Sequence, residues 1–329
     1  MSTSYAQLVD PQLIERIIGS DYQNGARLIT SGVVRREGVP MESTQVEWVK
    51  NTLFSTEDEG QAIGVNTEIN LKSLVQTEYA MSIVSRADGA ELDDIVEEIT
   101  PKRQTEIEAT FANDLSRKAG QMVDSVGIKI IDGCRAFIVT DTTNYNDANG
   151  SQVNLVDLEQ TKATRGENGQ NFAGGFMIMR GIMYHQMAAL GLVAATSNTM
   201  GNMAQNEIVR GGLKGTILDM NILTTDKIAL ETTGGVDHFI IMIEAGALAM
   251  KLSGAPKIDP FIRATKAFKD SVKFRLRLGG IVDGLSWSAA KTNIVTNTDL
   301  ATGTNYEQAA TYMKNVPMCV VRFDAPSFA

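Results

Sequence analysis

The sequence predicts an α+β protein, on three observations. Residues 270–278 alternate apolar and cationic side chains, which is the period of a β-strand with one buried face. Residues 107–122 place apolar side chains at every third or fourth position, which is the period of an amphipathic helix. Residues 128–250 then mix strand-like and helix-like segments, as α+β domains do.

The composition is that of a folded globular protein. The 329 residues are 43% hydrophobic and 21% charged, and the length suits two domains or one large elaborated domain. The N-terminus has no signal-peptide pattern, and the most apolar stretch, residues 239–250, contains Glu244 and is too short to span a bilayer. We therefore expect a soluble protein that is intracellular when made.

The charge is acidic overall but unevenly distributed. A net charge of −9 and a pI near 4.9 argue against a general nucleic-acid binder. Residues 251–277 nevertheless hold eight Lys or Arg and two Asp, a local charge of +6 that leaves −15 on the rest of the chain. An opposite-charge partner would exploit this asymmetry.

The N-terminal part of the sequence predicts a helix followed by a hairpin. Residues 5–20 have a ragged apolar face typical of a short helix. Residues 45–54 and 65–84 are rich in β-formers, and the polar, Gly-containing segment 55–60 separates them. Two such runs around a polar connection predict a long hairpin with an acidic tip.

Residues 90–124 predict a long helix. Acidic residues lead into Thr100 and Pro101, a cap followed by a proline in the first turn. The apolar face is Ile107, Phe111, Leu115, Ala119 and Met122. The paired acids at 93–94 and 97–98 complement the helix macrodipole at its start, so we do not expect them to act as a general acid and base.

The remaining segments alternate in type. We expect helices at residues 156–164 and 182–190, and a loop of small polar residues at 196–206. Strands are expected at residues 128–139, 176–179, 216–228, 270–288 and 312–323.

Residues that could carry chemistry are few. Cys134 and Cys319 have no metal or disulfide spacing and are expected to be free buried thiols, and His185 and His238 are expected to be structural. The glycine-rich segment Gly211–Thr216 lacks both the P-loop and the dinucleotide-binding spacing. We therefore predict no catalytic residues, no metal and no cofactor, which favours a structural or assembly role over an enzyme.

Taken in order, the segments resemble the major capsid proteins of tailed bacteriophages with the Hong Kong 97 fold. The likeness covers nearly the whole chain, and the order of the motifs carries it. The helix, turn, apolar strand and helix passage is "VNLVDLEQTKATRGENGQNFAGGFMIMRGIMYHQM" (153–187). The later passages are "GLKGTILDMNILTTDKI" (212–228), "FIIMIEAGALAM" (239–250) and "NIVTNTDLATGTNYEQAATYMKNVPMCVVRFDA" (293–325).

The resemblance implies five regions of a Hong Kong 97-like capsid fold. They are an N-terminal arm (1–35), an E-loop hairpin (36–85), a peripheral domain with a long spine helix (86–127), an axial domain (128–250), and the return strands of the peripheral domain (251–329). The loop at 196–206 is expected at the symmetry axes of the shell.

The resemblance also implies a function. The subunit would form pentamers and hexamers of an icosahedral shell that encloses double-stranded phage DNA, as part of the virion capsid assembled in the bacterial host cytoplasm. Implied partners are other copies of the chain and a portal protein, with scaffolding and decoration proteins as further candidates. The sequence departs from the family in two ways, because it has no long charged N-terminal scaffolding segment and no recognisable Lys, Asn and Glu set for crosslinking. A mildly anionic wall would also let DNA be packed and ejected, since it avoids tight phosphate binding.

The cationic face of residues 270–278 then has a candidate partner. We expect Lys273, Arg275 and Arg277 to meet acids of a neighbouring subunit, with Asp58 and Glu59 on the hairpin tip as first choice. The alternative is a solvated strand face with no partner.

Two other functions remain open at this point. One is an encapsulin-like bacterial compartment shell of the same fold. The other is an enzyme that binds a nucleotide at Gly211–Thr216.

Overall fold

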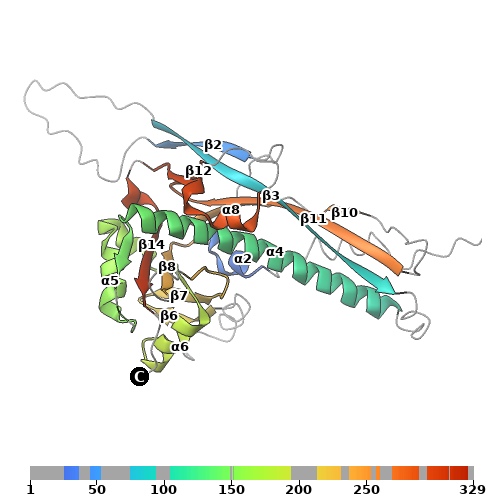
Figure 1. The fold of residues 1–329 in the computed structure, drawn as a ribbon, viewed down its shortest axis with the longest axis horizontal. Coiled ribbons are helices and arrows are strands. Elements are labelled where there is room, and N and C mark those ends of the chain that lie inside the picture. The colour runs from blue at the N-terminus through green and yellow to red at the C-terminus, as the bar shows by residue number, and fades with distance from the viewer. Residues whose placement is uncertain are drawn as a thin grey trace, which may run out of the picture.

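The structure is a computed structural model. It describes residues 26–36, 45–52, 75–93, 104–148, 150, 152–193, 213–230, 237–252, 257–259, 269–288, 295–310 and 312–324. Helices and strands alternate along these residues, and a long central helix runs through the molecule beside two sheets (Figure 1).

The described helices differ greatly in length. The α-helices are α2 (Arg27–Ser31), α4 (Gln104–Asp141), α5 (Leu155–Ala163), α6 (Gly181–Ala189) and α8 (Asn297–Ala301). The short 3-10 helices are η2 (Gly166–Phe172), η3 (Gly303–Asn305) and η4 (Met313–Asn315). The 38-residue helix α4 is the spine on which the other elements pack.

One six-stranded sheet runs along α4. Its order is β1-β9-β11-β3-β2, and β10 also pairs with β11. The strands are β1 (Val34–Arg36), β2 (Gln45–Thr52), β3 (Val75–Asp93), β9 (Leu248–Leu252), β10 (Lys257–Asp259) and β11 (Lys269–Val282). The long antiparallel pair of β3 and β11 extends beyond the body together with the first half of α4 (Figure 1).

A second six-stranded sheet forms the body, with the order β4-β14-β8-β5-β7-β6. Its strands are β4 (Tyr145–Asp147), β5 (Phe176–Met179), β6 (Leu213–Ile217), β7 (Met220–Thr224), β8 (His238–Ile243) and β14 (Met318–Phe323). A small separate sheet pairs β12 (Leu285–Trp287) with β13 (Tyr306–Gln308).

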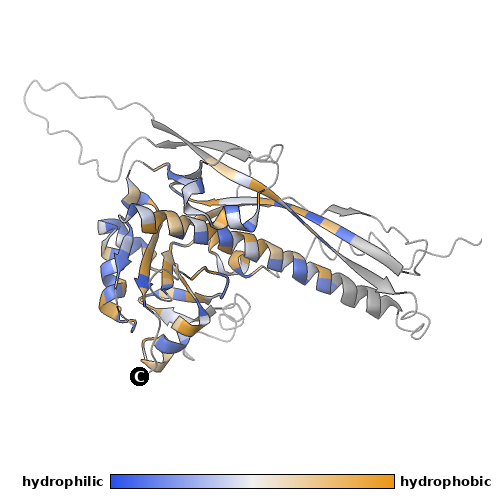
Figure 2. Cartoon of the chain, viewed as in Figure 1, coloured by the Kyte–Doolittle hydropathy of each residue, from blue (hydrophilic) through white to orange (hydrophobic). Residues whose placement is uncertain are grey.

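The body sheet is buried on both faces. Alternate residues of β8 divide between two cores: Ile241 lies in the core shared with α4, and Ile240 lies in the core shared with α5 and α6. The same alternation separates Val320 from Val321 on β14. Burial on both faces explains why the sequences of β8 and β14 are nearly continuous apolar runs, which are coloured orange in Figure 2.

The hairpin prediction is confirmed for the described residues. β2 and β3 are antiparallel, from Gln45 opposite Ser82 to Thr52 opposite Val75. β3 then continues across the predicted boundary at residue 85 to Asp93, so residues 91–93 belong to a strand and do not lead directly into the helix. The tip, the segment 65–74, and Thr100 with Pro101 lie outside the described residues.

The predicted strand at 128–139 is wrong, because α4 continues to Asp141 and crosses the predicted boundary at residue 127. Residues 130–135 are all buried, since this half of α4 lies between the two sheets and α8. A helix that is buried on all sides loses the periodicity that identifies it, so its β-branched residues resembled a buried strand.

Several shorter predictions are confirmed with small shifts. The helices at 156–164 and 182–190 are α5 and α6, and the strand at 176–179 is β5. The run at 216–228 instead holds the end of β6 and all of β7, because Leu218 and Asp219 have positive φ angles (49° and 61°) that turn the chain. The predicted helix at 5–20 and the loop at 196–206 lie outside the described residues.

The predicted return strands are also shorter than expected. A turn at Asp283 and Gly284 ends β11 and separates it from β12. The last strand begins only at Met318, because η4 occupies residues 313–315.

Candidate assembly surface

The alternation of residues 270–278 is realised in β11. Phe274, Leu276 and Leu278 are buried in the core that includes α4, at 1%, 2% and 1% exposure. Lys273 and Arg275 are exposed on the opposite face, and Arg277 is half-buried. We call Lys273, Arg275 and Arg277 the cationic strip.

Small residues stand opposite the cationic strip on β3. In the register of the sheet, Lys273 is opposite Gly89, Arg275 is opposite Ala87, and Arg277 is opposite Ser85. None of these three directly opposite positions supplies an acid. The next residue on the same face of β3 is Glu91, which is opposite Ser271. On the other edge of β11, the register sets Asp259 of β10 opposite Lys273 and Lys257 opposite Arg275, one charge of each sign.

The nearest described acid on β3 serves the other face of the sheet. Asp88 is opposite the buried Phe274 and forms an ion pair with Lys118 of α4, with 3.4 Å between Oδ2 and Nζ. It therefore links β3 to the spine helix α4 on the face of the sheet opposite the cationic strip.

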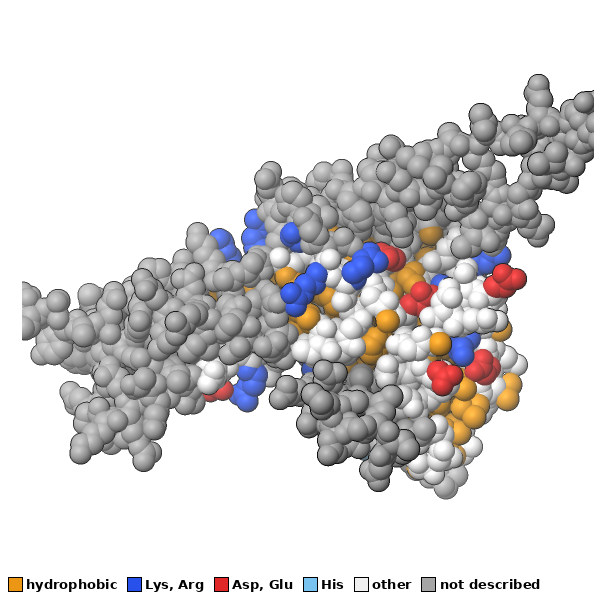
Figure 3. All heavy atoms as spheres, turned by 180° about the vertical axis from the view of Figure 1, so that it is seen from behind, with side chains coloured by type: hydrophobic (Ala, Val, Ile, Leu, Met, Phe, Trp, Pro, Cys, Tyr) orange, Lys and Arg blue, Asp and Glu red, His pale blue; other side chains and the backbone are white. Residues whose placement is uncertain are grey.

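The two signs of charge are separated on one face of the molecule. Seen from behind, Lys and Arg side chains lie mainly toward the arm, and Asp and Glu side chains lie mainly over the body (Figure 3). Among the residues coloured in this view, the separation agrees with the uneven charge of the sequence.

The structure brings together only part of the predicted contact. The three residues of the cationic strip share one strand face. Asp58 and Glu59 lie outside the described residues, so their contact with the strip stays a prediction.

Cys134 and Cys319 are free and buried, as predicted, and burial raises the pKa of both thiols to about 12. Within the part of the chain that the structure describes, no group of three or more His, Cys, Asp or Glu is placed to hold a metal ion, and no helix is long and apolar enough to cross a membrane. Residues 213–216 lie in strand β6, so this part of the glycine-rich segment is not a loop that could enclose a phosphate.

The two histidines differ from expectation. His185 is exposed on α6, with its ring 5.5 Å from that of Tyr184, so it is not a core residue. His238 is 5% exposed at the start of β8, and its Nδ1 atom has no hydrogen-bond partner among the described residues. Its burial agrees with the structural role expected for it, although Nδ1 is buried without a partner.

Sequence reasoning missed a pocket between α2, α4 and the end of β7. Its residues come from three segments about a hundred positions apart, so no local pattern could have indicated it.

No family model and no curated protein sequence matches the chain. Solved structures match it over most of its length. A chain of the head structure of Helicobacter pylori bacteriophage KHP40 has a TM-score of 0.54 and 10% identity, covering 99% of this chain and 93% of that chain. A chain of the capsid of Ralstonia phage GP4 has a TM-score of 0.56 and 11% identity, covering 92% and 90%. The acid-stable capsid structure of Helicobacter pylori bacteriophage KHP30 gives 0.50 and 11%, covering 99% and 93%.

The chain has the fold of phage capsid proteins. The predicted α+β capsid fold is therefore confirmed, and the Hong Kong 97-like form of it is consistent with these structures. Within this capsid fold, the cationic strip lies on the strands that accompany the spine helix.

Proposed function

We propose that the chain is the major capsid protein of a tailed bacteriophage. It forms pentamers and hexamers that build an icosahedral shell around double-stranded DNA. The observation that carries this proposal is the coverage of the fold likeness, which spans almost all of this chain and of the chains in phage head and capsid structures. A shared fold alone does not define a function, so the proposal also needs support from the surface.

The shape of the molecule supports self-assembly. The pair of β3 and β11 and the first half of α4 extend beyond the body (Figure 1). An extended arm has much surface for its volume and is best buried against neighbouring subunits. The cationic strip lies on this arm, where it is available to a second copy.

The cationic strip is proposed to fix the register between subunits. Its partners would be Asp58 and Glu59 on the hairpin tip of a neighbour. Each exposed ion pair contributes about 0 to 1 kcal/mol, but the same pair recurs at every equivalent contact of a shell. Opposite charges also select the correct pairing over wrong ones.

The remaining parts of the proposal follow from a shell role. The protein would act without catalysis, reside in the virion after assembly in the host cytoplasm, and meet a portal protein at one vertex. Scaffolding and decoration proteins are further candidate partners. The nucleotide-enzyme alternative has lost support, because residues 213–216 lie in a strand.

The first test is the size of the purified protein. Light scattering behind size-exclusion chromatography, with negative-stain images of the leading peak, should give megadalton particles or rings of five and six subunits. A species of 35.6 kDa at every salt concentration would contradict self-assembly.

The second test concerns the cationic strip. The double variant Arg275→Glu/Arg277→Glu should remove particles while the melting temperature of the subunit stays close to that of the wild type. Arg36→Glu is the matched control, because Arg36 is also an exposed cation on this sheet but lies on the far strand β1. Normal particles from the double variant would refute the role of the strip.

A further inference from the structure

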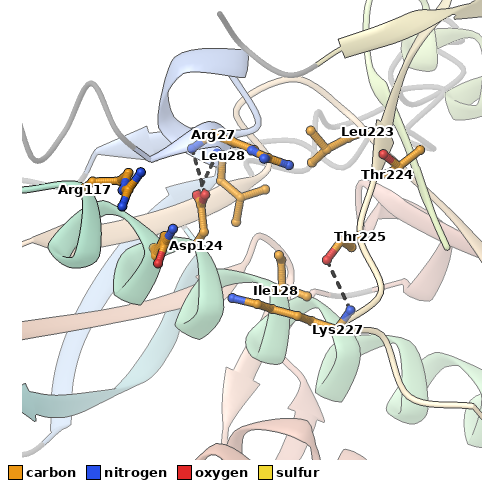
Figure 4. Close-up of a pocket in the computed structure, with 10 residues that line it drawn as sticks. Arg27, Leu28, Arg117, Asp124, Ile128, Leu223, Thr224, Thr225 and Lys227 are labelled. Carbon is orange, nitrogen blue, oxygen red and sulfur yellow. Dashed lines mark hydrogen bonds between the residues drawn. The ribbon is translucent and has the colours of Figure 1, made fainter. Parts of the chain in front are cut away.

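A pocket of about 490 Å³ lies where α2 and the end of β7 meet α4. Figure 4 shows side chains from all three segments around it. Its lining residues are Arg27, Leu28, Arg117, Gln121, Asp124, Ile128, Leu223, Thr224, Thr225 and Lys227.

The rim of the pocket is cationic. Arg27, Arg117 and Lys227 are all exposed. Among the described residues, no ion pair joins Arg27 or Lys227 to an acid, and Arg117 forms a solvent-exposed pair with Asp114 at 3.1 Å. Exposed pairs of this kind contribute little, so the guanidinium of Arg117 remains able to bind another anion.

The one acid that lines the pocket is already engaged. Asp124 accepts hydrogen bonds from the backbone N–H groups of Arg27 (2.9 Å) and Leu28 (3.0 Å), one on each carboxylate oxygen. Ala26, at the N-cap position of α2, provides no side-chain cap, so Asp124 caps this helix from α4. Asp124 is 8% exposed. Because its carboxylate is held by these backbone N–H groups, the exposed cations leave a surplus of positive charge at the rim.

The floor of the pocket is apolar. Leu28, Ile128 and Leu223 line it and are 0%, 6% and 2% exposed. A cationic rim over an apolar floor suits a peptide that carries acids beside apolar side chains, because arginines bind carboxylates and the floor accepts aliphatic groups.

One segment of this chain has that chemistry. Residues 94–98 read Asp-Ile-Val-Glu-Glu, so three acids flank two aliphatic side chains. The hairpin tip at 55–60 is acidic as well but carries no aliphatic side chain. We propose that the pocket binds residues 94–98 of a second copy of this chain, an inference that rests on the proposed self-assembly.

The geometry favours a second copy over the same chain. Asp88 pairs with Lys118, which follows the lining residue Arg117 but does not itself line the pocket, and β3 runs from there toward the start of α4 (Figure 1). Asp93 is five residues further along, about 17 Å at the rise of a strand. Asp93, the last described residue before this segment, therefore lies beyond the pocket of its own chain.

The test uses a fluorescent peptide of residues 91–100 and fluorescence anisotropy with the full-length protein. Saturable binding is expected, and the double variant Arg27→Gln/Lys227→Gln should raise the Kd at least tenfold. Lys118→Gln is the matched control, since Lys118 is an exposed cation of α4 outside the pocket, and it should leave the Kd within twofold. Thermal melts establish that each variant is folded.

Two further peptides test specificity. A peptide with Asp94→Asn, Glu97→Gln and Glu98→Gln should bind at least tenfold more weakly, because the rim loses its anions. A scrambled peptide of unchanged composition should also bind at least tenfold more weakly, because the aliphatic pair no longer lies between the acids. Equal binding of the scrambled peptide would overturn the proposal and leave a general anion site.

Peptide binding and shell formation are separate readouts. Particles that form although the peptide does not bind would overturn the pocket inference and leave the capsid function intact. Peptide binding by a chain that forms no particles would support the pocket and contradict the capsid function.

Discussion

At the scale of single residues, Asp132 joins the spine helix to the segment that follows β7. It is fully buried and accepts hydrogen bonds from Arg135 Nε (2.9 Å) and from the backbone N–H of Ala229 (3.1 Å). Arg135 also stacks on the ring of Phe239, 4.1 Å from its centroid. A buried ion pair of this kind is costly to break, because one charge is then left in a poor solvent.

Replacing Asp132 should therefore destabilise the subunit strongly. We expect Asp132→Ala to lower the free energy of unfolding by about 3–5 kcal/mol, measured by urea denaturation. Asp114→Ala is the control on the same helix, because Asp114 pairs with Arg117 at 63% exposure. That change should cost about 0–1 kcal/mol, and equal losses in the two variants would contradict the buried role.

His238 predicts a pH dependence of stability. Burial lowers its pKa below 6.5, the charge of Arg180 lowers it further, and Asp237 opposes both effects. The unfolded state then takes up the proton more readily than the folded state, so stability is present above pH 6.5 and is lost as the pH falls below it. Arg322 also lies here, near Asp237 at 3.4 Å, and retains its charge throughout.

The measurement compares melting temperatures of the wild type and His238→Gln between pH 7.5 and 5.5. The wild type should lose more thermal stability than the variant over this range. Parallel curves would mean that other groups carry the pH dependence.

At the scale of elements, α4 approaches its neighbours closely at Gly133. A Cβ atom at this position would overlap the backbone oxygen of Leu300 in α8 and the ring of Tyr306. The Tyr306 hydroxyl donates a hydrogen bond to the same oxygen of Leu300, at 2.6 Å. This contact layer holds α8 and the start of β13 against the buried half of the spine helix.

Gly133→Ala should destabilise the subunit although alanine favours helices. Alanine is preferred over glycine in a helix interior by about 1 kcal/mol, so a gain would be expected without the overlap. Overpacking of this layer should instead cost about 1–3 kcal/mol, measured as a lower urea midpoint. Gly181→Ala is the control, since its Cβ would meet only Asp226 Oδ1 at 3.7 Å, and a stabilised Gly133→Ala would disprove the close packing.

At the scale of the whole molecule, charge separation predicts how assembly responds to salt. The cationic strip and the cationic pocket are both proposed to bind acidic segments of other copies. Exposed charges are screened over about 8 Å at 0.15 M ionic strength. Particle yield should therefore fall as NaCl rises from 0.05 to about 0.5 M, followed by light scattering. The Arg275→Glu/Arg277→Glu variant should show a smaller salt response than the wild type. Identical responses would show that assembly does not depend on the charges of the strip.

Much of the fold could be predicted from the sequence by itself. The alternation in β11 predicted which of its faces is buried and which is exposed. The predicted bounds of α5 and α6 agree with the structure within two residues. The spacing of Cys134 and Cys319 predicted free thiols. These features depend on neighbours within one turn or one pleat, so a local pattern reports them directly.

Only the tertiary structure decided the rest. The second half of α4 is surrounded by two sheets and α8. Because it is buried on all sides, the sequence of residues 128–139 has no helical periodicity that could have predicted a helix. The capping of α2 by Asp124 and the pocket beside it join residues about a hundred positions apart. Such contacts depend on which surfaces are buried together in the folded chain, and that choice belongs to the packing of the whole molecule.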